Sequence, residues 1–163
     1  MVRHAYLVKE LEKWGVVRGR IPLLYGHAFE AQVGTYTLYW RSNEDGEVVT
    51  GRYSPTSGIN GPSQRLTSVR SFIRIALTIP REIPINPDQS LAVSIRAGPY
   101  PKVYISLFNN PVDNEGWYEE YQDKDLLRVA LEFMRTGEQN PLFDRLEELG
   151  GKVGQLVNFL RSL

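Results

Sequence analysis

The stretch TYTLYWRSNEDGEVVTGRY, residues 35–53, decides the fold that the sequence predicts. Successive side chains of an extended chain point to opposite faces. In the first half of the stretch, every second side chain is apolar or aromatic: Tyr36, Leu38 and Trp40. The middle, SNEDGE, has the composition of a tight turn, and EVVTGRY has the composition of a returning strand. The stretch therefore predicts an antiparallel β-hairpin.

The rest of the chain predicts further strands, and helices at both ends. Alternating apolar side chains mark strands in residues 23–33, 69–79, 91–97 and 102–108. Helical spacing marks residues 2–14 and 124–136, and Asn140 begins a final helix. We expect an α+β fold, with an antiparallel sheet of four to six strands backed by helices on one face. Residues 1–138 would form this domain, and residues 139–163 a C-terminal self-association helix.

The composition excludes several classes of protein. Of the 163 residues, 42% are hydrophobic and 23% are charged, as in an ordinary soluble globular protein. There is no cysteine, so disulfides, thiolate catalysis and cysteine-bound metals are excluded, and the chain fits a reducing cytoplasm. No apolar run approaches the roughly 20 residues that span a membrane. We expect no cofactor and no membrane partner.

Residues 69–79, VRSFIRIALTI, point to a function. As a strand, this stretch has one aliphatic face and one face that interleaves Arg70, Phe72 and Arg74. The corresponding faces of the other predicted strands carry cations and rings, and no carboxylate once the acids of turn 44–47 are set aside. The complete candidate face is Tyr39, Arg41, Arg52, Arg70, Phe72, Arg74, Arg96, Lys102, Tyr104 and Phe108.

Such a face is suited to single-stranded nucleic acid. Cations follow the phosphates and flat rings stack on bases with little sequence preference. Residues 1–110 carry 13 Lys and Arg against 8 Asp and Glu, a net charge of +5, which favours a polyanionic partner there. The predicted phosphate ligands are Arg70, Arg74, Arg96 and Lys102, and the predicted stacking rings are Tyr39, Phe72 and Tyr104. In the alternative interpretation, the rings pack under the loop of residues 54–68 or the first helix, and the arginines extend to water.

The C-terminal stretch predicts self-association. Its apolar residues recur at intervals of four and three, the spacing of a coiled-coil seam: Leu142, Leu146, Leu149, Val153, Leu156, Leu160 and Leu163. Three glycines off the seam, Gly150, Gly151 and Gly154, either allow close helix contact or break the helix. We expect a homo-oligomer, a dimer or tetramer. Alternatively, the helix packs back on its own sheet.

Catalysis has weaker support. Residues 109–125 are rich in acids, and two of them could hold Mg²⁺ in a nuclease. The sequence around them supplies neither a fixed lysine nor a complete calcium loop. His4 and His27 have no second ligand type nearby, so both are expected to be surface or core residues. We expect no enzyme activity. A structural or adaptor protein, with the sheet face and C-terminal helix as protein interfaces, is the alternative to nucleic-acid binding.

The order of these parts resembles the ThermoDBP family of archaeal single-stranded DNA-binding proteins and its related proteins. The resembling stretches are VRSFIRIAL, SIRA and KVYISLF, together with the middle helices and the C-terminal leucine seam. The resemblance implies a sheet backed by helices, a cleft of basic and hydrophobic residues, and assembly through the C-terminal helix. It also implies binding of single-stranded DNA without marked sequence preference, with RNA as a ligand in related members.

Overall fold

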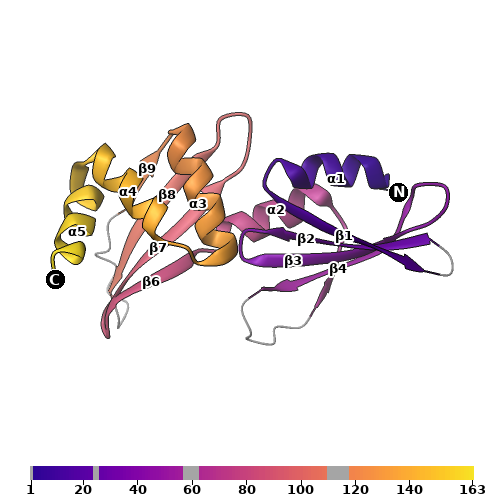
Figure 1. The fold of residues 1–163 in the computed structure, drawn as a ribbon, viewed down its shortest axis with the longest axis horizontal. Helices are drawn as coiled ribbons and strands as arrows, with labels where there is room; N and C mark the ends of the chain where they lie inside the picture. Colours follow the sequence, from indigo (N-terminus) through magenta and orange to yellow (C-terminus); the bar gives the residue numbers. More distant parts are fainter. Residues whose placement is uncertain (1, 24–25, 57–62, 110–117) are drawn as a thin grey trace. The chain divides into compact units, whose positions relative to one another are not determined.

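The computed structural model describes residues 2–23, 26–56, 63–109 and 118–163, and it confirms the α+β class with antiparallel sheets (Figure 1). The backbone divides into two compact units, Met1–Leu77 and Thr78–Leu163, and each has a sheet of its own. The sequence predicted one sheet and a C-terminal segment that begins at residue 139. The C-terminal helices belong to the second unit.

The first unit contains a five-stranded antiparallel sheet in the order β1-β2-β3-β4-β5. Its strands are β1 (Gly15–Leu23), β2 (Gly26–Val33), β3 (Tyr36–Ser42), β4 (Val48–Pro55) and β5 (Gln64–Arg65). The hairpin predicted from residues 35–53 is confirmed as β3 and β4. Two helices complete the unit, α1 (His4–Glu12) and α2 (Val69–Thr78).

Both helices cover the same face of this sheet, and we call it the core face. Leu7 and Leu11 of α1 and Leu38 of β3 are fully buried. The ring of Phe72 on α2 lies 5.1 Å from the ring of Tyr53, which is on the strand next to Leu38. The opposite face, described below, is not covered by either helix (Figure 1).

The strand predicted for residues 69–79 is wrong, because this stretch forms helix α2. Its buried residues are spaced as on one side of a helix: Val69, Phe72, Ile73, Ala76 and Leu77. The hydroxyl of Ser68 accepts a hydrogen bond of 3.2 Å from the amide of Ser71, as an N-cap serine does. The apolar residues satisfy both the strand and the helix pattern, and the cap favours the helix.

The second unit contains a four-stranded antiparallel sheet in the order β6-β7-β8-β9. Its strands are β6 (Arg81–Asn86), β7 (Gln89–Arg96), β8 (Lys102–Asn109) and β9 (Tyr118–Tyr121). Its helices are α3 (Lys124–Thr136), α4 (Asn140–Leu149) and α5 (Gly151–Arg161). β7 and β8 confirm the strands predicted for residues 91–97 and 102–108. β6 and β9 were not among the predicted strands.

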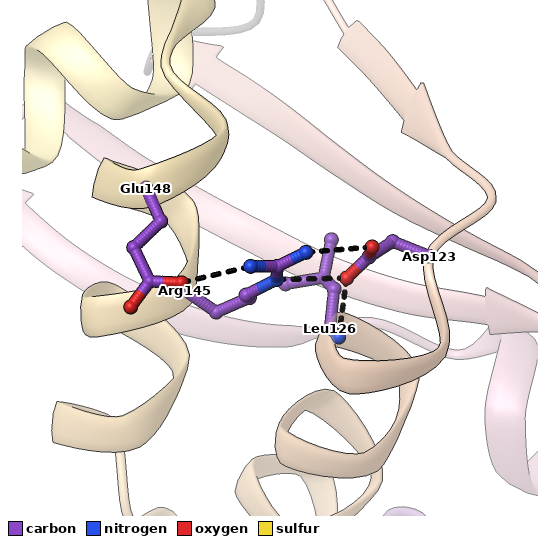
Figure 2. A network of polar contacts seen from close by, with 4 residues as sticks. All are labelled: Asp123, Leu126, Arg145 and Glu148. Atoms are coloured by element: carbon purple, nitrogen blue, oxygen red, sulfur yellow. Dashed lines mark hydrogen bonds and ion pairs between the residues drawn. The ribbon is translucent and has the colours of Figure 1, made fainter.

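Helix α3 begins and ends where its sequence predicts. Asp123 is the N-cap, with its carboxylate accepting a hydrogen bond of 2.9 Å from the amide of Leu126. Gly137 ends the helix with a left-handed φ of 82°, a conformation that glycine adopts without strain. Arg145 of α4 binds the same Asp123 carboxylate and also Glu148, so one carboxylate caps α3 and holds α4 (Figure 2).

The single C-terminal helix expected for residues 139–163 is two helices instead. The chain breaks at Gly150, which has φ 72° and ψ −147°. Arg161, at the end of α5, then binds Asp144 and the backbone carbonyl of Asn140 in α4. The seam therefore folds back on itself: Leu142, Leu146 and Val153 are buried, Leu149, Leu156 and Leu160 are partly buried, and Leu163 is exposed.

Candidate nucleic-acid interface

The open face of the first sheet, opposite the core face, carries a row of long side chains. Paired residues on neighbouring strands place one member of the row on each strand: Arg18, Glu30, Tyr39, Arg52 and Arg65. Arg41 lies two residues from Tyr39 on the same face. Because neighbouring strands lie about 4.8 Å apart, the row extends about 19 Å across the sheet. We call these six residues the arginine face.

The side chains of the arginine face are accessible, and the arginines use only some of their hydrogen-bond donors within the protein. The ring of Tyr39 is 53% exposed, so a flat ligand can reach it. Arg52 donates two hydrogen bonds to Ser63, at 2.9 and 3.0 Å, and Arg41 donates one to the hydroxyl of Thr50 at 3.4 Å. A guanidinium has five N–H donors. Both arginines are thus oriented by the protein and retain donors for a ligand.

The arginine face borders a hollow of about 330 Å³. Five of its six residues line this hollow: Arg18, Glu30, Tyr39, Arg41 and Arg52. Gly19, which also lines it, has a left-handed φ of 76° in a β-bulge between Arg18 and Ile21. A bulge bends its strand and increases the local twist. The bulge therefore contributes to the shape of the hollow at Arg18 and Gly19.

The charge of the first unit matches this face. Residues 1–77 contain 10 Lys and Arg against 6 Asp and Glu, a net charge of +4. Residues 78–163 contain 9 against 13, a net charge of −4. A polyanion is attracted to the unit that carries the exposed arginines.

The prediction of a face without carboxylates is wrong, because the arginine face includes Glu30. It lies within the row, between Arg18 and Tyr39 on the adjoining strands. Arg18 and Arg65 were not among the residues predicted for this face. Arg18 and Glu30 share a face because β1 pairs with β2, which periodicity within one strand does not reveal. Arg65 follows a stretch without strand periodicity and gave no signal.

The candidate residues of α2 do not lie on a sheet face. Phe72 is 1% exposed and belongs to the core of the first unit, so it cannot stack on a base. Arg70 and Arg74 are exposed, one helical turn apart, on a helix that covers the core face. The face predicted for residues 69–79 does not exist, because side chains alternate between two faces in a strand and not in a helix.

The remaining candidate residues lie on the open face of the second sheet, so the structure does not gather all ten on one sheet. Arg96 and Lys102 face each other on β7 and β8, and Tyr104 and Phe108 follow on β8. Lys102 lies 3.8 Å from Glu120, and the ring of Tyr104 lies 6.3 Å from that of Tyr118. Glu82 shares this face, because it pairs with Ala92, which pairs with Ser106 beside Tyr104. Two acids thus balance two cations.

The other candidate sites have structural partners or lie outside the described residues. The Nδ1 atom of His4 accepts a hydrogen bond of 3.0 Å from the indole of Trp40, as expected of a core histidine. Glu119 accepts a hydrogen bond from the hydroxyl of Tyr121, and burial, together with this contact, raises the pKa of Tyr121. Asp113, Glu115 and the side chain of His27 are outside the described residues.

In residues 2–23, 26–56, 63–109 and 118–163, no three His, Asp or Glu side chains gather as a metal site would require. None of the helices in these ranges combines the length and apolar character needed to cross a membrane. In comparisons with known proteins, no family model, curated protein or solved structure matched the chain.

Proposed function

We propose that this protein binds single-stranded nucleic acid, DNA or RNA, on the arginine face, without catalysis. The observation that carries the proposal is the row of arginines around an exposed tyrosine, beside a hollow on a sheet face that neither helix of the first unit covers. Arg18, Arg41, Arg52 and Arg65 bind phosphates, and Tyr39 stacks on a base. The resemblance to the ThermoDBP family implies the same class of ligand.

The shape of the face favours single strands over a duplex. A base must be unpaired to lie flat on the ring of Tyr39, and exposed bases are available only in single strands. Sequence reading in duplex DNA usually places a helix or a β-ribbon in the major groove. The arginine face is instead one side of a five-stranded sheet, without a helix on it.

The test measures binding of fluorescent strands of about 12 nucleotides, as single-stranded DNA, single-stranded RNA and duplex DNA. Four phosphate contacts predict that the logarithm of the affinity falls with the logarithm of salt concentration with a slope of about −3. Arg18→Gln or Arg41→Gln should each reduce this slope by about 0.7. If neither single-stranded DNA nor single-stranded RNA binds, the proposal is contradicted.

Arg70→Gln is the matched control. Arg70 is an exposed arginine of the same unit, but it lies on α2, which covers the opposite face of the sheet. The substitution removes the same charge, so it reports the effect of net charge alone. If Arg70→Gln weakens binding as much as Arg41→Gln does, the ligand is not located on the arginine face.

A second candidate function is a structural or adaptor protein that associates through the second unit. Phe159 is 58% exposed on α5 and Leu163, which follows it, is 86% exposed, which favours a protein partner or a second copy. Light scattering across a range of protein concentrations tests self-association, and Phe159→Ser should weaken it. Assembly that nucleic acid leaves unchanged, without nucleic-acid binding, would favour this candidate.

A further inference from the structure

Glu30 is the one acid of the arginine face, and it lies where a bound base would present its edge. It pairs directly with Tyr39 on the adjoining strand and lines the same hollow. Side chains paired in this way have Cβ atoms about 5 Å apart. A base stacked on the Tyr39 ring therefore has an edge within hydrogen-bonding reach of the Glu30 carboxylate.

The carboxylate of Glu30 is free to accept such hydrogen bonds. Among the residues that the structure describes, none forms a side-chain hydrogen bond or an ion pair with it, and Arg18 opposite it is likewise unpaired. An ionised carboxylate accepts hydrogen bonds with both oxygens and donates none. A partly buried carboxylate in a ligand-sized hollow thus selects for a ligand edge with adjacent donors.

We infer that the site prefers guanine at the position stacked on Tyr39. The Watson–Crick edge of guanine presents two adjacent donors, N1–H and the 2-amino group, which match the two oxygens of one carboxylate. Cytosine and adenine each place an acceptor beside their amino group, and thymine and uracil place carbonyl groups on both sides of N3–H. Glu30 therefore repels part of the edge of every other base. This inference rests on the proposed function and adds a base preference at one position to it.

An alternative role for Glu30 is to neutralise the arginines around it. The two roles differ in the effect of Glu30→Gln. Loss of a neutralising charge strengthens the binding of all strands equally. Loss of a guanine ligand removes the preference for guanine, because the amide NH₂ of glutamine faces a second donor.

The test compares strands of about 12 nucleotides with the repeats TTG, TTC and TTI, where I is inosine, which lacks the 2-amino group. The wild-type protein should bind TTG about ten-fold more tightly than TTC, with TTI between them. Glu30→Gln should reduce the TTG preference to less than about two-fold while TTC binds at least as tightly as before. Glu12→Gln is the matched control, because it removes an exposed acid from α1, and it should retain the preference.

The outcomes separate this inference from the proposed function. Equal binding of all three repeats, with the expected salt dependence, overturns the guanine preference and leaves the nucleic-acid interface standing. A preference that Glu30→Gln retains also overturns the role of Glu30. Absence of binding to every strand overturns both. Thermal melting of each variant checks that the fold is intact.

Discussion

Arg145 and Asp123 form a two-pronged ion pair that joins α4 to the first turn of α3. The Nε and Nη2 atoms of Arg145 lie 2.9 and 2.8 Å from the two carboxylate oxygens of Asp123 (Figure 2). The same carboxylate accepts from the amide of Leu126, so it is both a helix cap and an ion-pair partner. The hydrogen bonds from Arg145, and then the one from Leu126, lower the pKa of Asp123 below its ordinary value of 3.8.

Substitutions at Asp123 should separate its two roles. Asp123→Ala removes the cap and the ion pair, and the lost cap alone costs about 1 kcal/mol of unfolding free energy. Asp123→Asn retains a good capping group and loses only the charge, so it should cost less. Urea denaturation of the full chain measures both. Equal losses would show that the cap contributes little.

The lowered pKa of Asp123 also predicts a pH dependence. A folded-state pKa below the unfolded value means that the ionised form stabilises the fold. This stabilisation is complete above the ordinary value of 3.8 and is lost as the pH falls through the lowered folded value. The stability difference between wild type and Asp123→Asn should therefore be constant at neutral pH and shrink below about pH 4. A difference that grows on acidification would contradict the assignment.

Phe72 and Tyr39 should respond oppositely to replacement by alanine. Phe72 is buried, so Phe72→Ala should cost about 3–5 kcal/mol of unfolding free energy through a cavity. Tyr39 is exposed, so Tyr39→Ala should leave the melting temperature nearly unchanged and weaken binding of a single strand by about 1–3 kcal/mol. Melting and binding measured on both variants provide the check. Normal binding by Tyr39→Ala would show that its ring does not stack.

Replacing Gly154 by alanine should destabilise the protein, although the same replacement stabilises most helices. Alanine exceeds glycine by about 1 kcal/mol in helix propensity. A Cβ at position 154, however, would lie 2.7 Å from the backbone oxygen of Leu146 on α4. Gly154→Ala should therefore destabilise the protein, by about 1–3 kcal/mol. Gln155→Ala, at the exposed neighbouring position on α5, is the control and should be neutral or slightly stabilising.

The hydrogen bond between His4 and Trp40 predicts a further stability effect. Trp40 is 2% exposed, and its indole N–H donates to Nδ1 of His4 at 3.0 Å. His4→Ala leaves this donor buried without its acceptor, at a cost of about 1–3 kcal/mol. Tryptophan fluorescence during thermal unfolding measures the change. An unchanged midpoint would mean that water replaces the histidine.

Local chemistry made several elements predictable from the sequence. The hairpin of β3 and β4 follows from alternation around a turn, and α3 follows from the Asp123 cap and the Gly137 stop. The strand assignment of residues 69–79 failed because their apolar residues satisfy two periods at once. The sequence signal that favours the helix, the cap by Ser68, lies outside the stretch itself.

The candidate site was predictable only in part, because it depends on strand pairing. Tyr39, Arg41 and Arg52 were found, since alternation places them on one face of a hairpin. Arg65 joins them only because β5 pairs with β4 at Arg52. Periodicity within one strand contains no information about which strands are neighbours, so it could not divide the ten candidate residues between two sheets.

The turn at Gly150 and Gly151 also determines what the leucine repeat contacts. A helix continuous from Asn140 to Arg161 would be about 33 Å long and would present the whole repeat to another chain. With the turn in place, the repeat is used within the molecule, and α5 is bound to α4 through Arg161. The same contacts could be made between two molecules that exchange their last helix, so this dipeptide is the hinge at which domain swapping would begin.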